Sequence, residues 1–338
     1  MTLAIETVSL TRRYGRAIAL DNLNLTVQQG SIYGFIGPNG AGKTTTLRLL
    51  AGLLAPSSGE VRLMGKLQHI GSAQRLVGYM PDVSGVYDDL RVWEYLDFFA
   101  RCYGMATAER RKTVGSLLDL VGLDTRRDTF VQSLSRGMQQ RLSLAHALVH
   151  NPPVLLLDEP ASGLDPRARV ELRELLRALR EMGKTVVLSS HILSELAEVC
   201  NEIGIIESGR MVVSGSVDVV RQQLQGGAKL RIKVLHDPRE AEAALRPLIA
   251  RAEDAVPSGQ DESGRAEDVP ERPAGLPTIR RLSGDPSDRR VFLIEAESLV
   301  EEDQAALLAY LLSKGVAVSE FGAQAESLED LFLRLTAE

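Results

Sequence analysis

A glycine-rich segment, "GPNGAGKTT" at residues 37–45, has the residue types and the spacing of a phosphate-binding loop. It matches the pattern G-x-x-x-x-G-K-[ST] at Gly37, Gly42, Lys43 and Thr44. Glycines let successive backbone N–H groups turn towards an anion, and the start of the helix expected over "KTTTLRLLAGLL" adds positive partial charge. The Lys43 ammonium would reach the β- and γ-phosphates of a nucleotide, and the Thr44 hydroxyl would ligate Mg²⁺. Nine consecutive residues are expected around the phosphates: Gly37, Pro38, Asn39, Gly40, Ala41, Gly42, Lys43, Thr44 and Thr45.

An acidic pair in "VLLLDEP", residues 154–160, could supply the second half of such a site. Four apolar residues place Asp158 at the end of a buried strand, where a carboxylate without a partner is costly. Mg²⁺ is the expected partner, directly or through water. Glu159 is the next residue and could orient and deprotonate an attacking water. An acidic pair alone would be solvated surface, but together with the phosphate loop it predicts nucleotide hydrolysis.

The elements that must position these residues are predicted by continuous apolar runs. Such runs are typical of strands buried on both faces of a parallel sheet. They occur in "SIYGFIG" (31–37), "VLLLDE" (154–159), "TVVLSS" (185–190) and "EIGIIES" (202–208).

A helix is predicted between two of these strands, over residues 165–183. Asp165 is its expected N-cap, Pro166 suits its first position, and Gly183 follows its end. Its leucines fall on one face, as in a helix packed on a sheet. The order strand, helix, strand predicts an α/β sheet with right-handed crossovers.

Two other regions differ in character. Residues 88–150 read as mostly helical, as in "DDLRVWEYLDFFARCYG". From about residue 227 the strands "KLRIKVL" and "RRVFLIEA" and the helix "EEDQAALLAYLLSKG" are expected. Between them, residues 251–290 are rich in Pro, Gly, Ser and charged residues, which predicts a disordered insertion because little apolar surface is available to offset chain entropy.

Composition excludes several classes. The 338 residues carry a formal net charge of −6, without the basic footprint of a nucleic-acid binder, so no nucleic-acid partner is expected. Cys102 and Cys200 are too few for a disulfide framework, which favours a reducing cytosol. No apolar run approaches the roughly 20 residues that span a bilayer, and the first residues lack a signal peptide. The His146–His150 pair has a zinc-compatible spacing, but no third ligand near it completes a zinc set, so packing is the preferred interpretation.

The octet "LSRGMQQR", residues 134–141, is a polar corner ahead of an apolar helix. Together with the phosphate loop, "LLLDEP", "SGLD" and "SSH", in this order and spacing, it resembles the ATP-binding-cassette (ABC) ATPases over residues 1 to about 220. The resemblance implies an α/β phosphate-loop core over residues 1–222, with a RecA-like part, an antiparallel β part and a helical subdomain at about 83–150. The tail resembles the small α+β C-terminal domain of some of these subunits, over residues 227–338.

The same resemblance implies a site shared between two chains. Two cassettes bind head to tail, as a homodimer or a heterodimer with a second cassette. ATP then lies between the phosphate loop of one chain and the signature corner of the other, where Ser135 and Gly137 would donate hydrogen bonds to the γ-phosphate. The signature residues carried over are Ser135, Arg136, Gly137, Met138 and Gln139.

Three single residues carry over by the same match. Tyr14 would stack on adenine. His191 would contact the γ-phosphate and steady the water that Glu159 activates. Asp165 would lie at the dimer interface, a role that is compatible with capping its own helix.

Three positions depart from the family pattern. Asp82 stands where the family expects a glutamine that reaches Mg²⁺, and we expect it to keep a metal-proximal role. Arg136 and Met138 stand where glycine and glutamine are frequent. The corner should tolerate both, because the expected contacts use Ser135 and the Gly137 backbone.

The resemblance implies an ATPase subunit, with ATP and Mg²⁺ as its ligands, that energises a separate membrane permease, of export type. Such a subunit would be cytoplasmic and held on the inner face of the membrane by the permease. The alternative is a soluble cassette ATPase acting on nucleic acid or ribosomes. Those relatives commonly have two cassettes or long coiled coils, whereas this chain has one cassette and no heptads. A regulatory module with little turnover is a third possibility, against which the intact Lys43, Asp158 and Glu159 argue.

Overall fold

The computed structural model describes residues 2–82, 85, 87, 89–192, 196, 198–224, 228–249, 276–284, 288–296 and 300–323. The chain divides into two compact units, residues 1–222 and 223–331. The first unit carries all the motifs named above.

An antiparallel sheet begins the first unit, with strand order β2-β1-β4-β5. Its strands are β1 (Leu3–Tyr14), β2 (Ala17–Gln28), β4 (Ser58–Leu63) and β5 (Lys66–Leu67). Along β2, from Leu23 to Gln28, buried and exposed residues alternate, so one face packs on the core. This is the antiparallel β part that the family resemblance implies.

A six-stranded sheet forms the centre of the unit, in the order β10-β9-β3-β8-β7-β6. The strands are β3 (Ile32–Ile36), β6 (Val77–Met80), β7 (Val154–Leu157), β8 (Thr185–Ser190), β9 (Glu202–Glu207) and β10 (Arg210–Ser216). Every residue of β3, β7 and β8 is buried, which confirms the prediction from their apolar runs. All neighbouring pairs are parallel except β9 with β10.

The parallel pairing places the carboxyl ends of four strands at one edge of this sheet. The glycine-rich loop follows β3, Asp82 follows β6, Asp158 and Glu159 follow β7, and His191 follows β8. Ligands of open α/β sheets bind outside this edge. The fold therefore gathers residues that lie between positions 37 and 191 of the sequence.

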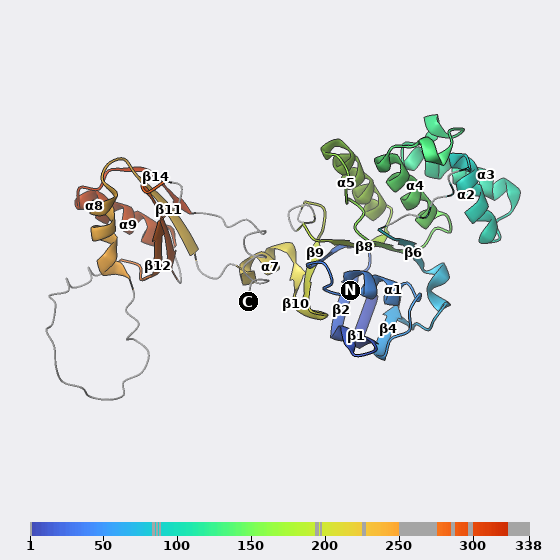
Figure 1. Cartoon of the computed structure of the whole chain (residues 1–338), viewed down its shortest axis with the longest axis horizontal. Helices are drawn as coiled ribbons and strands as arrows, with labels where there is room; N and C mark the ends of the chain where they lie inside the picture. The colour runs from blue at the N-terminus through green and yellow to red at the C-terminus, as the bar shows by residue number, and fades with distance from the viewer. Residues whose placement is uncertain are drawn as a thin grey trace. The chain divides into compact units, whose positions relative to one another are not determined.

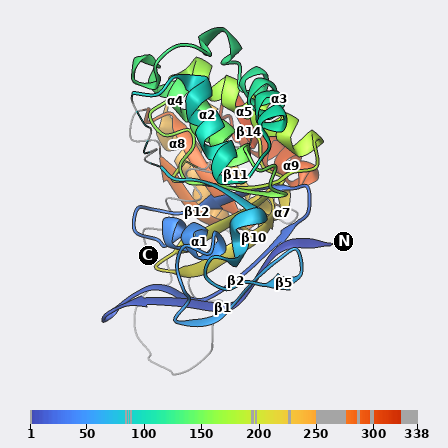
Figure 2. The ribbon, with the colours of Figure 1, turned by 90° about the vertical axis from the view of Figure 1, so that its right-hand side faces the viewer.

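Helices cover the two faces of the central sheet. Both views place α1 (Lys43–Leu50) with β1 and β2 on one side, and α4 (Arg136–Leu148) and α5 (Pro166–Glu181) on the other (Figures 1 and 2). The helical character predicted for residues 88–150 is confirmed by α4 and by α2 (Val92–Cys102) and α3 (Thr107–Leu120). Short 3₁₀ turns complete the unit: η1 (Ser72–Arg75), η2 (Asp124–Arg126) and η3 (Val131–Ser133).

The second unit has its own antiparallel sheet, in the order β12-β13-β11-β14. The strands are β11 (Ala228–Val234), β12 (Ile279–Gly284), β13 (Val291–Ala296) and β14 (Val318–Ala323). The boundary between the two units falls within α7 (Val217–Leu224). The helices of the second unit are α8 (Pro238–Leu245) and α9 (Glu301–Ser313), with η4 (Arg246–Leu248) after α8. The predicted strands and helix of this region are therefore confirmed, and α8 and α9 share an apolar core with the sheet.

The predicted disordered insertion at 251–290 is wrong for its last part. Residues 279–284 form β12, which pairs with β13. Ile279 is fully buried and Leu282 packs on the same core, so two apolar residues on either side of a register shift suffice for an edge strand in a polar segment. Residues 250–275 and 324–338 lie outside the described residues, and the second range includes the C-terminal segment "ESLEDLFLRLT" (326–336). In the described part of the chain, no helix combines the length and apolarity needed to cross a bilayer.

Candidate functional site

The glycine-rich loop depends on two glycines for its path from β3 into α1. A Cβ on Gly37 would lie 2.3 Å from the Ile206 carbonyl oxygen. Gly42 is the N-cap of α1 with φ at 110°, and a Cβ there would lie 2.8 Å from the Ala19 carbonyl oxygen. The loop therefore needs glycine at both ends, and it directs the N-terminus of α1 towards the sheet edge.

Lys43 is buried at the first position of α1. Its ammonium donates hydrogen bonds to the carbonyl oxygens of Gly37 at 2.6 Å and Pro38 at 3.3 Å. It also lies 3.3 Å from the Glu159 Oε1 atom. The loop carbonyls thus hold the ammonium at the point where the loop meets the acidic pair.

Asp158 and Glu159 are fixed by a serine on the neighbouring strand. Ser189 Oγ donates to Asp158 Oδ1 at 2.7 Å and accepts from the Glu159 backbone N–H at 2.9 Å. Asp158 is only 1% exposed. Ser189 belongs to the "SSH" motif, but the sequence indicated no role for it; its position beside the acidic pair follows from the parallel pairing of β7 with β8.

The Glu159 carboxylate lies between two basic groups. Its Oε1 faces Lys43, and its Oε2 lies 2.9 Å from His191 Nδ1. Glu159 adopts a left-handed backbone with φ at 47°, which few residues other than glycine, Asn and Asp adopt. Strained backbone of this kind clusters at functional sites.

A cavity of about 400 Å³ is bordered by Lys43, Glu159 and His191, whereas Asp158 and Ser189 are not among its lining residues. Its lining includes most of the predicted loop together with Asp82, Glu159 and His191, and two residues that the sequence did not indicate, Ala19 and Ser162. The loop residues in the lining are Pro38, Asn39, Gly40, Gly42, Lys43, Thr44 and Thr45. Ser162 is the first residue of the "SGLD" motif, so membership of that motif was the available signal.

Asp82 lies in an acidic environment at this cavity. Its partial burial raises the pKa of its carboxyl, and the neighbouring charges of Asp158 and Glu159 raise it further, whereas Arg136 lowers it. The donors Thr44, Asp82 and Asp158 are the hard oxygen ligands that Mg²⁺ prefers. Asp158 is buried near other carboxylates, which suits a divalent cation. In the part of the chain that the structure describes, however, no three or more His, Cys, Asp or Glu side chains gather into a complete metal-binding set. Mg²⁺ typically keeps waters and substrate phosphates as its other ligands.

The signature corner does not line this cavity. Ser135 is the N-cap of α4, and its Oγ accepts from the Met138 N–H at 3.4 Å. Gln139 Nε2 donates to the Val131 carbonyl at 3.4 Å. Asp165 caps α5, with Oδ1 accepting from the Ala168 N–H at 2.9 Å, which confirms the predicted cap.

Tyr14 also lies outside the cavity lining, at the end of β1. Its side chain is exposed, and the Arg12 guanidinium lies 4.6 Å from the centre of its ring. One face of the ring is therefore in contact with a cation.

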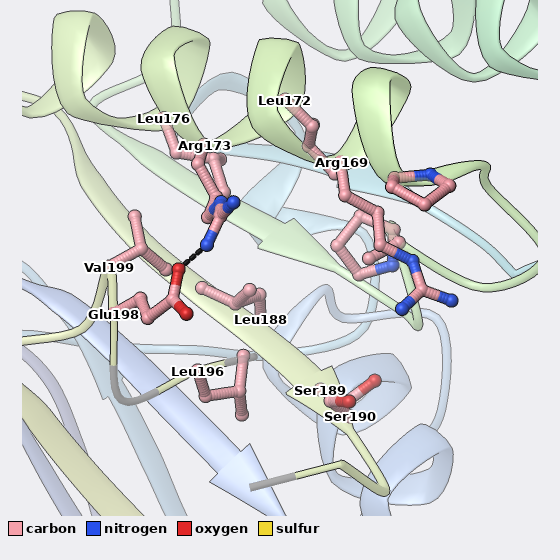
Figure 3. Close-up of a pocket in the computed structure, with 13 residues that line it drawn as sticks. Arg169, Leu172, Arg173, Leu176, Leu188, Ser189, Ser190, Leu196, Glu198 and Val199 are labelled. Atoms are coloured by element: carbon pink, nitrogen blue, oxygen red, sulfur yellow. Dashed lines mark ion pairs between the residues drawn. The ribbon is translucent and has the colours of Figure 1, made fainter. Parts of the chain in front are cut away.

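A second, smaller cavity of about 220 Å³ lies between α5 and β8 (Figure 3). Leucines of α5 and β8 form much of its wall, and Ser189 and Ser190 lie at one end. Arg173 forms an ion pair with Glu198 at its margin. This cavity was not predicted, because it arises from packing between elements.

The two histidines of α4 are packing residues. His146 stacks on Phe99 with ring centres 3.7 Å apart, and His150 stacks on Tyr103 at 4.2 Å. Burial lowers the pKa of His146 to about 4, so the ring is neutral at pH 7. These contacts agree with the packing interpretation of the pair.

Comparison with known proteins gives concordant matches. The family model described as "ABC transporter" matches residues 20–162. The chain is 40% identical over 217 residues to the Nod factor export ATP-binding protein I of Cupriavidus metallidurans, which spans 64% of this chain and 72% of that protein. The protein of the same name from Burkholderia thailandensis is 36% identical over 294 residues, which cover 83% of this chain and 97% of that protein. A solved structure, "Structure of ATP binding subunit of ABC transporter", has a TM-score of 0.59 and 31% identity, covering 65% of this chain and 92% of its own.

Proposed function

We propose a mechanism and a direction of transport for this chain, which belongs to the ABC transporter family and is the ATP-binding ATPase component that energises such a transporter. In this proposal the chain hydrolyses MgATP at a site completed by a second cassette. The resulting closure and opening of the pair drives export through a separate membrane permease.

The observation that carries the proposal is the position of Glu159. Its carboxylate lies at the cavity between the Lys43 ammonium, 3.3 Å away, and the His191 imidazole, 2.9 Å away. A general base must be within hydrogen-bond reach of its water and beside the phosphate that the water attacks. Lys43 marks the phosphate position, because its ammonium lies at the N-terminus of α1 within the phosphate loop.

The roles of the remaining residues follow from this placement. The N–H groups of the loop and of the start of α1 would bind the phosphates, and Lys43 would neutralise charge on the β- and γ-phosphates. Thr44 and Asp158, with Asp82 beside them, would hold Mg²⁺, which supplies charge neutralisation of the phosphate oxygens when bound. Glu159 would accept the proton of the water, and His191 would orient Glu159 through its Nδ1 atom. Tyr14 would contact the adenine with its free face.

The signature corner supports a two-chain site. Ser135 starts α4 with its hydroxyl and the helix N-terminus exposed to solvent, an arrangement that suits an anion. Because Ser135 and Gly137 do not line the chain's own phosphate cavity, they would act on the nucleotide of a partner cassette. We propose a head-to-tail dimer, with Asp165 at its interface, as the state that hydrolyses ATP.

Export is supported by the names of relatives that align over most of their length. The exposed aromatic side chains of the helical region offer a surface for the permease. Tyr87 and Phe98 are 55% and 45% exposed, and their ring centres lie 5.9 Å apart. Large exposed apolar side chains that gather in this way are typical of interaction sites.

Purification of the tagged chain from detergent-solubilised membranes tests the transporter assignment. The wild-type chain should retain an integral membrane protein, and Phe98→Ser should lose it while its ATPase activity in isolation is unchanged. Leu53→Ser, at a 58% exposed leucine outside the helical region, is the matched control. Co-sedimentation with ribosomes or nucleic acid instead of a membrane protein would favour the soluble alternative.

A further inference from the structure

Arg12 is a residue of β1 whose guanidinium lies over the ring of Tyr14. The Arg12 Cζ atom is 4.6 Å from the ring centre, and a cation within about 6 Å of that centre is attracted to the ring face. The Tyr14 side chain is 45% exposed, at the last residue of β1. The chain's own cation therefore covers one face of an exposed aromatic ring, and the opposite face is the one that remains for a ligand.

The Arg12 guanidinium is also fixed from a second side. Its Nη1 donates to the Ala55 carbonyl oxygen at 2.9 Å, in the segment between α1 and β4. That segment is bonded to β1 on both sides of Arg12: the Ser57 N–H donates to the Thr11 carbonyl at 2.8 Å, and Ser57 Oγ accepts from the Arg13 N–H at 3.0 Å. The guanidinium is thus held between a backbone carbonyl and the ring.

The Arg12 Nε atom adds a reason for this arrangement. It is buried, and among the described residues no acceptor is bonded to it. Burial of a polar N–H without a hydrogen bond is costly, and contact with the negative face of an aromatic ring offsets part of that cost. The contact with Tyr14 therefore stabilises the guanidinium as well as the ring.

The hairpin that carries the ring borders the phosphate cavity. Tyr14 pairs with Ala17 at the start of β2. Ala19, two residues further along β2, lines the cavity, and its carbonyl oxygen would lie 2.8 Å from a Cβ on Gly42, the N-cap of α1. Tyr14 is therefore carried by the strand pair that passes the phosphate loop, although the ring itself is not part of the cavity lining.

We propose that Arg12 is a positioning residue for the base of the nucleotide, which holds the Tyr14 ring from one face so that the other face is ordered before adenine stacks on it. Ordering a side chain during binding lowers affinity, and a ring that is already held avoids this loss. The planar guanidinium suits the task because it can cover a ring and donate from its edge at the same time. The inference rests on the proposed role of Tyr14 at the adenine.

Calorimetric titration with two ligands, ADP and inorganic pyrophosphate, tests this role in the full chain with Mg²⁺ present. ADP carries the adenine but lacks the γ-phosphate that a partner cassette would contact, so dimerisation does not contribute. Pyrophosphate occupies the phosphate loop without a base. The variants are Arg12→Ala, Arg12→Lys, Tyr14→Ala and the double alanine variant. Arg13→Ala is the matched control, because it removes the same charge from the next, exposed residue of β1.

Tyr14→Ala should raise the dissociation constant of ADP about 5- to 150-fold, the range for loss of one base–aromatic stack. Arg12→Ala should raise it about three- to tenfold. In the Tyr14→Ala background the same change should have less than about a twofold effect, because no ring is left to hold. Arg12→Lys should lie between the wild type and Arg12→Ala, because the charge is kept and the planar head is lost.

Pyrophosphate affinity should stay within about twofold of wild type in every variant, because neither side chain is assigned to the phosphates. This result also shows that the phosphate loop is folded in each variant. Arg13→Ala should leave the affinity for both ligands unchanged.

Equal effects of Arg12→Ala on ADP binding in the wild-type and Tyr14→Ala backgrounds would overturn the proposal, since Arg12 would then act independently of the ring. A parallel loss of pyrophosphate affinity would overturn it as well, because it would indicate a phosphate contact or a distorted loop. Tyr14→Ala separates the two levels of the argument. Wild-type ADP affinity in that variant contradicts the adenine assignment itself, whereas a Tyr14-dependent affinity that is insensitive to Arg12→Ala contradicts the positioning role alone.

Discussion

The Ser189 hydroxyl links the two acidic residues of the site, since it donates to the buried Asp158 carboxylate at 2.7 Å and accepts from the Glu159 backbone N–H at 2.9 Å. A single side chain on β8 therefore fixes both the residue assigned to the metal and the residue assigned to the water. It also explains how Glu159 is held in a left-handed backbone conformation.

Ser189→Ala should reduce the turnover number about 10- to 100-fold, because misplacement of a catalytic group by about 1 Å has an effect of that order. The dissociation constant for ATP should change little, because the phosphate loop is untouched. Steady-state ATPase assays and nucleotide binding measure the two quantities. Thr185→Ala is the control. It removes a similar hydrogen bond at the opposite end of β8, in which the Thr185 hydroxyl accepts from the Gly30 N–H. Equal turnover in both variants would contradict this role of Ser189.

Gly37→Ala should abolish nucleotide binding, or folding of the first unit, because its Cβ would lie 2.3 Å from a backbone oxygen of β9. Backbone cannot give way as the end of a side chain can. Gly115→Ala in α3 is the control, because its Cβ meets open space and alanine favours helix by roughly 1 kcal/mol. Circular dichroism and nucleotide binding distinguish loss of fold from loss of site. A Gly37→Ala protein that binds ATP normally would be incompatible with the loop geometry.

Much of this arrangement could be predicted from the sequence. The strands β3, β7, β8 and β9 are continuous apolar runs, and α5 has an Asp165 cap, an N1 proline and a terminal glycine, so local pattern determined them. The loop and Glu159 could be assigned to one site from their motifs and the strands that they follow, whereas His191 was assigned through the family resemblance.

What could not be predicted depends on contacts between distant segments. Ser189 is one of two serines at the end of β8, and only strand register shows which one faces the acidic pair. The hydrogen bond from Arg12 to the Ala55 carbonyl requires the packing of β1 against the segment that follows α1. β12 was missed because the polar composition of its surroundings outweighed two apolar residues, Ile279 and Leu282.

Asp165→Ala should lower the free energy of unfolding by about 1 kcal/mol, the usual effect of removing an N-cap. Asp165→Asn should retain most of that stability, because an amide oxygen also accepts from the Ala168 N–H. Urea unfolding measures both. If Asp165 also acts at the dimer interface, Asp165→Asn should weaken ATP-dependent dimerisation while leaving the cap intact. Equal stability of the alanine and asparagine variants would contradict the cap.

The stability of the first unit should fall as pH decreases from about 6.5 towards 4. Burial lowers the pKa of His146 from 6.5 to about 4, so in this range the unfolded chain binds a proton that the folded chain does not. The stabilising contribution is present above pH 6.5 and is lost through this window. His146→Phe should show a smaller decrease, because phenylalanine can keep the stacking on Phe99 without titrating. Urea unfolding across the pH range measures this, and identical pH profiles would contradict the assignment.

The most direct test of the two-chain site combines two measurements: the oligomeric state of the Glu159→Gln variant, and the dependence of wild-type ATPase activity on protein concentration. Removing the general base should reduce turnover by about 10² to 10⁴ while ATP binding persists. Light scattering should then find the variant as a dimer with MgATP and as a single chain without it, and wild-type activity per chain should rise with protein concentration. A wild-type preparation that stays monomeric and hydrolyses ATP at a rate per chain independent of concentration would contradict the account.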